Sequence, residues 1–311
     1  MTPDNAPSAP AGDGEETRAG TVAIVGYPNA GKSSLLNRML EQKLSIVTSA
    51  AQTTRERVLG IDTRGGVQIV FVDTPGLVDP RYLLHRAMLN TVLETIPDVD
   101  VAVLLLDPTT PDREFSPEVL DLLRQKRDRL LVAVNKADDA SAERIEQLRG
   151  WARAELAANP LVISASTGQG VEELRSRIAE LLPVSPFLYP EDEISSQSVR
   201  FFVAELVRET VFEKYGQEVP YSTTVKVDEF REAAQPIYVR ATIFVERPTQ
   251  KAILIGKGGA AIKQLGQLAR AKIEDFVGAP VYLDLWVKVL PKWRKDPTAL
   301  ARLGFKVPNE S

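Results

Sequence analysis

Apolar residues in the first half of the chain form short runs that are separated by amphipathic segments. Strands are predicted at residues 21–25, 58–61, 67–72, 101–106, 130–134 and 161–163. Helices are predicted at residues 33–40, 81–96, 116–125, 141–158 and 171–181. Alternating strands and helices predict an α/β domain over residues 21–183, with a mostly parallel sheet covered on both faces. Gly65 and Gly66 predict one antiparallel hairpin inside this sheet.

The pattern changes near residue 183. Prolines at 183, 186 and 190 break helical periodicity and predict a linker over residues 184–197. Beyond it, helices are predicted at residues 199–215 and 260–276, and strands at residues 221–227, 237–245 and 281–289. The order predicts a separate α+β domain over residues 198–304. Residues 1–20 and 305–311 are expected to be terminal tails, the first one disordered because it is rich in Pro, Ala, Gly and acids.

Composition excludes several classes of chemistry. The chain has no cysteine, so it forms no disulfide and has no thiolate nucleophile. A single histidine, His85, argues against a Ser–His triad or a multi-histidine metal site. The apolar runs are far shorter than the ~20 residues that span a bilayer.

Charge is distributed unevenly. The formal net charge of −4 argues against a nucleic-acid partner. Residues 247–306, however, hold twelve Lys and Arg against four acids, a net charge of +8. Because binding depends on the local field, this basic segment favours RNA as a partner of the second domain.

A phosphate-binding loop is the strongest motif. The sequence matches G-x-x-x-x-G-K-[ST] through Gly26, Tyr27, Pro28, Asn29, Ala30, Gly31, Lys32 and Ser33, followed by Ser34. A predicted strand precedes the loop and a helix follows it, so backbone N–H groups and the helix N-terminus would surround an anion. Lys32 is expected to reach the β- and γ-phosphates, and the Ser33 hydroxyl to coordinate Mg²⁺.

Two further segments are expected to contact the γ-phosphate and the metal. Asp73, Thr74, Pro75 and Gly76 end a predicted strand; the aspartate would hold Mg²⁺ and the Gly76 N–H would meet the γ-phosphate. The segment Gln52-Thr53-Thr54-Arg55 lies between the two motifs. Thr54 is the favoured threonine to close over Mg²⁺, and Thr53 is the alternative.

Guanine selectivity is predicted from the loops after the last two strands. The Asp138 carboxylate would accept hydrogen bonds from the guanine N1–H and 2-amino group, which adenine does not match. Asn135 would tie the loops together, and the Lys136 stem would lie along the base. In the segment Ser164-Ala165-Ser166, the Ala165 N–H would donate to guanine O6.

These motifs together resemble the Era family of translation-factor-related GTPases. The resemblance extends from residue 21 to about residue 304, and it includes Pro220-Tyr221-Ser222, the glycine-rich segment after Ile255, and Leu285-Trp286-Val287-Lys288-Val289. It implies binding of 16S ribosomal RNA near the 3′ end of the small-subunit RNA and assistance to maturation of that subunit. It also implies a GTP-dependent switch that hydrolyses GTP to GDP in the cytoplasm.

The glycine-rich segment resembles the GXXG loop of KH domains, which clamps about four nucleotides by their backbone. Gly256, Lys257, Gly258 and Gly259 form this loop, and Ile255 and Ile262 are expected to pack beneath it. Phosphate neutralisation is assigned to Lys251, Lys263, Arg270 and Lys272. Trp286 and Trp293 are expected to be packing residues rather than base-stacking platforms.

Slow intrinsic hydrolysis is expected, because Leu77 stands where Ras-like enzymes place a water-orienting glutamine. Asn29 has two open roles. By resemblance to similar GTPases it would help to hold K⁺ beside the phosphates; alternatively it only stabilises the loop.

Other classes of function are kept open by the sequence. They are a static RNA-binding module in which nucleotide is structural, an RNA-modifying enzyme gated by GTP, and a signalling GTPase held peripherally on the inner face of the membrane. The favoured protein is a monomer that binds GTP or GDP, Mg²⁺ and the assembling small ribosomal subunit, and not DNA.

Overall fold

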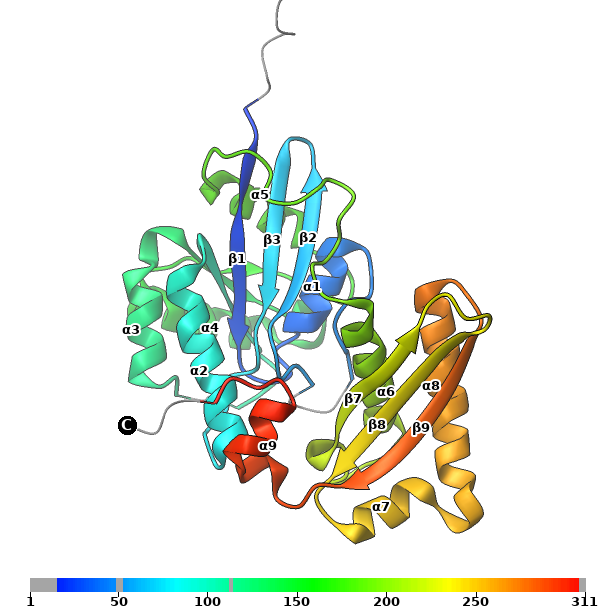
Figure 1. The fold of residues 1–311 in the computed structure, drawn as a ribbon. Helices are drawn as coiled ribbons and strands as arrows, with labels where there is room; N and C mark the ends of the chain where they lie inside the picture. The colour runs from blue at the N-terminus through cyan, green and yellow to red at the C-terminus, as the bar shows by residue number, and fades with distance from the viewer. Residues whose placement is uncertain (1–15, 49–52, 112–113, 308–311) are drawn as a thin grey trace, which may run out of the picture.

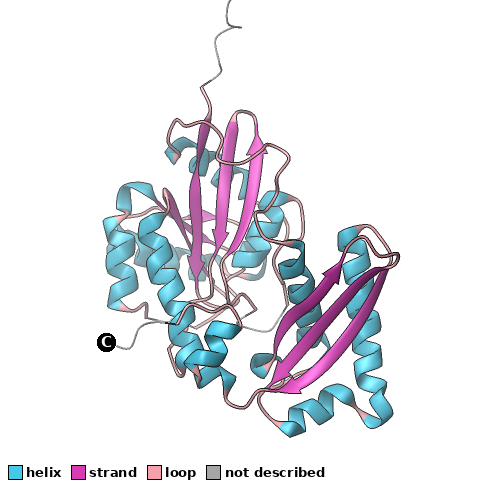
Figure 2. Ribbon diagram, viewed as in Figure 1, coloured by secondary structure: helices cyan, strands magenta, loops and turns pink. Residues whose placement is uncertain are grey.

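The computed structural model describes residues 16–48, 53–111 and 114–307. The chain forms two separate sheets, each covered by its own helices (Figures 1 and 2). Most of the expected N-terminal tail, Gln52 and residues 308–311 lie outside the described ranges. Within those ranges, no helix is long and apolar enough to cross a membrane.

The first domain is the predicted α/β unit. Its sheet has the order β2-β3-β1-β4-β5-β6 and is parallel except for the hairpin of β2 and β3. The strands are β1 (Arg18–Gly26), β2 (Val58–Arg64), β3 (Val67–Asp73), β4 (Val101–Leu106), β5 (Leu130–Val134) and β6 (Leu161–Val162). The helices are α1 (Lys32–Leu40), α2 (Leu83–Asp98), α3 (Pro117–Gln125), α4 (Ala142–Leu156) and α5 (Val171–Leu181).

Two apolar clusters hold this sheet between its helices. Leu36 of α1 and Ile178 of α5 pack on one face, and Val92 of α2, Leu123 of α3 and Ala152 of α4 pack on the other. Both faces of a parallel sheet must be covered, which explains why the central strands are nearly continuous apolar runs. All parallel strands therefore end at one edge, where the predicted motifs follow them.

The second domain has a three-stranded sheet of order β7-β8-β9, in which β8 and β9 are parallel and β7 is antiparallel. Its elements are α6 (Val199–Lys214), β7 (Thr224–Arg231), β8 (Ile237–Val245), α7 (Pro248–Ile255), α8 (Ala260–Val277), β9 (Val281–Val289) and α9 (Pro297–Arg302). The helices α6, α7 and α8 share one apolar core with a single face of the sheet, through residues such as Val207, Leu254 and Leu265.

Three expected boundaries differ in the structure. Strand β1 begins at Arg18, so residues 18–20 of the expected tail pair with β3. Residues 220–222 form a 3-10 turn instead of the start of a strand, because the Thr223 N–H donates to the Pro220 carbonyl and closes the turn. The expected C-terminal tail starts with a buried residue, Phe305.

Phe305 belongs to an apolar cluster that joins the two domains. The cluster contains Leu84 and Met88 of α2 together with Trp293 and Leu300 of the C-terminal segment. Figure 1 shows the red helix α9 lying against the cyan helix α2. The segment after β9 therefore connects the second domain to a helix of the first.

The two tryptophans of the second domain have different environments. Trp293 is fully buried in the joining cluster, and its Nε1–H donates to the Ser222 carbonyl at 2.9 Å. Trp286 lies on the outer face of β9 and is 54% exposed. The packing role expected for Trp293 is confirmed, and the same expectation for Trp286 is wrong, because no element covers that face in the described part of the chain.

Trp293→Ala is predicted to lower the free energy of unfolding by ~3–5 kcal/mol, because it leaves a large cavity and an unpaired carbonyl between the domains. Trp286→Ala, the matched exposed substitution, is predicted to change it by less than ~1 kcal/mol. Urea unfolding followed by circular dichroism measures both. Equal losses for the two variants would contradict the assignment.

Candidate nucleotide site and its junction with the second domain

The phosphate loop connects β1 to α1 at the edge where the parallel strands end. Gly31 has φ 91°, and a Cβ there would lie 2.3 Å from Asn135 Nδ2, so only glycine fits. The loop borders a cavity of about 340 Å³ that is lined by Pro28, Asn29, Gly31, Lys32, Ser33, Ser34, residues 46–48, Thr53, Thr54, Gly76 and Lys136. Four of the predicted motifs thus meet in one cavity: the phosphate loop and the segments that contain Thr54, Gly76 and Lys136.

Lys32 is buried at the base of this cavity. Its Nζ donates to the carbonyls of Gly26 at 3.0 Å and Tyr27 at 2.9 Å. Burial lowers the pKa of Lys32 to about 8, although the nearby charge of Asp73 acts in the opposite direction. The positive charge of this buried ammonium group is not fully balanced by Asp73. A phosphate in the cavity would supply the additional negative charge.

Hydroxyl and carboxylate oxygens converge beside Lys32. Ser33 Oγ donates to Asp73 Oδ2 at 2.8 Å, and Thr54 Oγ1 lies 3.0 Å from Ser33 Oγ and 3.3 Å from Asp73 Oδ2. Asp73 is fully buried, and its Oδ1 has no hydrogen-bond partner among the described residues. Oxygen ligands of this kind suit Mg²⁺, so the cluster fits the expected ion.

The structure favours Thr54 over Thr53 as the threonine at the metal site. The Thr54 hydroxyl lies in the oxygen cluster, whereas the Thr53 carbonyl accepts a hydrogen bond from Arg208 of α6. Gly76 closes the cavity from the side of β3. A Cβ at Gly76 would lie 2.8 Å from Pro28 Cγ, which shows how closely the two loops approach.

Asn135 ties three loops together, as predicted. Its Nδ2 donates to the Ala30 carbonyl at 2.8 Å, and its Oδ1 accepts from the Ala165 N–H at 2.9 Å. The Ala165 N–H, which is predicted to donate to guanine O6, donates to Asn135 Oδ1 in this structure. Asp107, which the sequence analysis missed, holds the Lys136 ammonium at 2.7 Å. Its signal is its position directly after the apolar run of β4.

Asp138 is exposed at the end of this group of loops. It accepts a hydrogen bond from Ser166 Oγ at 3.0 Å, and Ser164 Oγ lies 2.9 Å from Ser166 Oγ. Hydrogen bonds from Ser164 and Ser166 lower the pKa of Asp138, so its carboxylate is ionised and oriented. The geometry suits the recognition of two adjacent N–H donors.

Arg55, the residue after Thr54, points away from the cavity and into the second domain. Its guanidinium donates to the carbonyls of Thr223 at 2.6 Å, Tyr221 at 3.0 Å and Pro220 at 3.3 Å. It also lies 5.7 Å from the centre of the Trp293 ring. Burial, reinforced by the charge of Arg208, lowers the pKa of Arg55 to about 9, which leaves it a cation at neutral pH.

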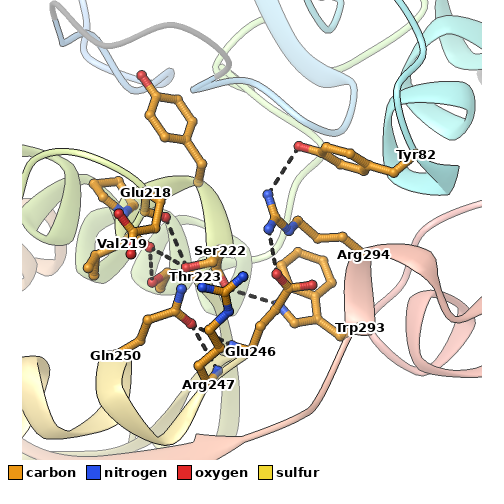
Figure 3. Close-up of polar contacts among 12 residues, drawn as sticks. Tyr82, Glu218, Val219, Ser222, Thr223, Glu246, Arg247, Gln250, Trp293 and Arg294 are labelled. Carbon is orange, nitrogen blue, oxygen red and sulfur yellow. Dashed lines mark hydrogen bonds and ion pairs between the residues drawn. The ribbon is translucent and has the colours of Figure 1, made fainter.

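The start of α2 is attached to the same corner of the second domain. Figure 3 shows Arg294 between Tyr82 and Glu246: the guanidinium donates to the Tyr82 hydroxyl at 3.3 Å and forms an ion pair with Glu246. The Trp293 indole N–H reaches the Ser222 carbonyl beside it. The sequence did not predict these contacts of Arg55 and Arg294, because the partners lie about 170 and 210 residues away.

The glycine-rich loop of the second domain separates α7 from α8, as predicted. Gly256, Gly258 and Gly259 all have positive φ, and a Cβ at Gly256 would lie 2.6 Å from the Ala261 Cβ. The predicted basic side chains Lys257, Lys263 and Arg270 are exposed and Lys251 is half-buried, while Ile255 and Ile262 pack onto the core. Lys272 is instead committed to ion pairs with Glu209 and Glu213 of α6.

Comparison with known proteins agrees with both domains. A family model described as a 50S ribosome-binding GTPase matches residues 21–136, and a KH domain model matches residues 218–294. The chain is 39% identical over 313 residues to GTPase Era of Bradyrhizobium diazoefficiens, covering all of both chains. It is 43% identical over 293 residues to GTPase Era of Pseudomonas putida strain W619, covering 93% of this chain and 97% of that one.

Two solved structures have the same architecture. One is a variant of Aquifex aeolicus Era bound to GDP·AlF4⁻, with a TM-score of 0.86, and the other is Era in complex with MgGDPNP and nucleotides 1506–1542 of 16S ribosomal RNA, with a TM-score of 0.87. Each is 35% identical to this chain and covers 94% of it and 100% of the other chain.

The fold and the site define a P-loop GTPase domain followed by a KH-type RNA-binding domain. The chain is a GTP-binding and GTP-hydrolysing enzyme. It belongs to the Era family of GTPases.

Lys32→Met is predicted to stabilise the nucleotide-free protein at pH 7 by on the order of 2–3 kcal/mol, because it removes a buried charge. The pKa of Lys32 is about 8 in the folded chain, against the ordinary lysine value of 10.5. Between these values the unfolded wild-type chain binds more protons, so wild-type stability rises with pH relative to the variant, and the difference closes near pH 10.5. Urea unfolding from pH 7 to 10.5 measures this; a constant difference would contradict the burial of a charged lysine.

Proposed function

We propose that the chain is a nucleotide-controlled RNA-binding switch. GTP and Mg²⁺ bind in the cavity, with phosphate held by residues 26–34 and by Gly76, the metal held by Ser33, Thr54 and Asp73, and guanine selected by Asp138. The bound metal would neutralise charge on the phosphates and orient them. This assignment is supported by the desolvated Lys32 ammonium and the open oxygen of Asp73.

The observation that carries the switch is the arrangement of three consecutive residues. The Thr54 hydroxyl lies in the oxygen cluster, while the Thr53 carbonyl and the Arg55 guanidinium on either side are bound by the KH domain. Loss of the γ-phosphate would release Thr54, and the two flanking contacts would then change with it. A segment that changes between an ordered and a disordered state is a known basis for switching in GTPases.

A second connection runs through the loop after Gly76. This loop leads to Tyr82 and α2, which contact Arg294 and Trp293 of the C-terminal segment. Both segments that border the γ-phosphate position therefore end on one corner of the KH domain. A change in either one would alter how the KH domain is held.

The proposed RNA is 16S ribosomal RNA near its 3′ end, and the proposed role is maturation of the small ribosomal subunit. An Era structure in complex with MgGDPNP and a fragment of that RNA supports this proposal, together with the glycine loop and its basic surroundings. The proposed contacts are Lys251, Ile255, Gly256, Lys257, Gly258, Gly259, Ile262, Lys263 and Arg270. The assembling subunit is the proposed partner.

RNA affinity is predicted to be roughly 5- to 150-fold higher with a non-hydrolysable GTP analogue than with GDP, the usual range of a coupling free energy between two sites. Fluorescence anisotropy with a labelled 3′-terminal fragment of 16S RNA measures it. Thr54→Val should bring the affinity in the analogue state down to the GDP level. Equal affinities in both states of the wild type would leave a static RNA-binding module.

Hydrolysis is proposed to be slow. Leu77 is buried with its backbone N–H on the Gly26 carbonyl, and its side chain cannot orient water. Arg55 is committed to the KH domain, so its charge does not reach the phosphates. A cation beside Asn29 would supply the missing charge.

If Asn29 helps to hold K⁺, GTP turnover is predicted to be roughly tenfold or more faster in KCl than in NaCl, because an extra cation would stabilise the charge that develops on the phosphates. Asn29→Ala should remove this difference, so that the rates in the two salts become equal. Steady-state phosphate release in the two salts measures it, and equal wild-type rates would rule out the role in potassium binding.

A further inference from the structure

The KH sheet has an outer face that none of its helices covers. Helices α6, α7 and α8 pack on the opposite face through Val239, Ile243 and Val287. Strand pairing places the outward residues in rows across β7, β8 and β9. The rows are Thr224–Phe244–Lys288, Lys226–Thr242–Trp286, Glu229–Arg240–Asp284 and Arg231–Tyr238–Tyr282. The face is thus aromatic, cationic and polar, and these rows contain no aliphatic side chain.

Two of its rings are open to solvent on the edge strand β9. Tyr282 is 59% exposed and Trp286 is 54% exposed. They lie four residues apart on one face, which separates them by ~13 Å along the strand. Neighbouring stacked bases are closer than this, so each ring offers a separate place for a base.

The rings are held in fixed orientations. Asp284 lies between them and accepts hydrogen bonds from Trp286 Nε1 at 3.1 Å, the Tyr238 hydroxyl at 3.2 Å and Arg240 Nε at 3.2 Å. The Tyr238 and Tyr282 rings are stacked at 5.9 Å with an angle of 12° between their planes. Burial alone would raise the pKa of Asp284, but these three donors hold it below its usual value, so the anchoring carboxylate stays charged.

The charges on this face leave cations available beside Trp286. Glu229 is paired with Arg231 and Arg240, and Asp284 is also paired with Arg240. The pairing of β7 with β8 has an irregularity between Val227 and Glu229, which places Asp228 between the rows. Asp228 accepts a hydrogen bond from the Thr242 hydroxyl. Lys226 and Lys288 are exposed, and neither has an ion-pair partner in the described part of the chain.

We propose that this outer face is a second RNA contact, at which Tyr282 and Trp286 stack two bases of single-stranded RNA while Lys226 and Lys288 meet its phosphates. Flat rings with adjacent cations suit nucleobases and phosphates, since every base offers a π face. Exposed lysines without ion-pair partners among the described residues favour RNA over a protein, because lysine is depleted at protein interfaces and phosphates would neutralise its charge. The inference rests on the proposed RNA-binding function, because this platform of Tyr282, Trp286, Lys226 and Lys288 would hold nucleotides that flank those at the Gly256–Gly259 loop.

Two RNA probes separate the platform from the glycine loop. The first is a four-nucleotide RNA, the length that a GXXG loop clamps. The second is the same RNA extended by four uridines at each end. Both are titrated into the full-length protein with Mg²⁺ and a non-hydrolysable GTP analogue.

Trp286→Ala is expected to weaken binding of the long RNA by roughly 5- to 150-fold, the usual effect of losing one stacked base, and to change binding of the short RNA by less than about twofold. Tyr282→Ala should act in the same direction. Trp286→Phe retains a ring and should stay within about threefold of the wild type. Leu188→Ala, at a linker residue that is 49% exposed, is the matched control and should change neither affinity.

The lysines have a separate signature. Lys226→Ala and Lys288→Ala should each lower the slope of log affinity against log salt for the long RNA by ~0.7, the value for one phosphate contact on a single strand. If Trp286→Ala binds the long RNA as tightly as the wild type, the platform is refuted, and a protein becomes the candidate partner of this face. If the short RNA loses as much affinity as the long one, Trp286 acts through the fold, which also refutes the platform. If the wild type binds neither RNA, the proposed RNA function itself fails.

Discussion

Burial of one guanidinium between the domains is the constraint on which the rest of the structure depends. Arg55 is desolvated and remains charged, so its donors must be satisfied inside the junction. The carbonyls of residues 220, 221 and 223 do this, because Pro220 starts a 3-10 turn that directs them toward the GTPase domain. Separating the domains would leave the Arg55 guanidinium and these carbonyls without their partners, and this free-energy cost holds the two domains together.

The position of Arg55 in the chain connects this contact between the domains to the oxygen cluster around Thr54. Thr54 immediately precedes it, and its hydroxyl lies within 3.3 Å of both Ser33 and Asp73. A shift of Thr54 by the width of one ligand would disturb a buried cation with fixed partners. The C-terminal cluster around Trp293 adds a second, apolar attachment through α2. The KH domain therefore holds both Thr53 and Arg55, on either side of Thr54.

The sequence was sufficient wherever local rules determine the structure. Strand alternation, the hairpin at Gly65 and the phosphate loop at Gly31 depend on neighbouring residues, and all are present as predicted. The contacts of Arg55 and the burial of Phe305 depend on residues far away in the chain, and periodicity carries no information about them. Trp286 and Trp293 show the same limit: packing was predicted for both, and only the tertiary structure shows that α2 covers Trp293 while no element in the described part of the chain covers Trp286.

The most direct test of this account is the ratio of GTP-analogue affinity to GDP affinity, measured by calorimetry in Mg²⁺ for Arg55→Met and for the exposed neighbour Arg57→Met. The account predicts that Arg55→Met lowers the analogue affinity by roughly tenfold and leaves GDP affinity unchanged, because Thr54 loses its support from the KH domain. Arg57→Met should leave both affinities as in the wild type. An unchanged ratio in Arg55→Met would contradict the claim that the KH domain holds the nucleotide-sensing segment.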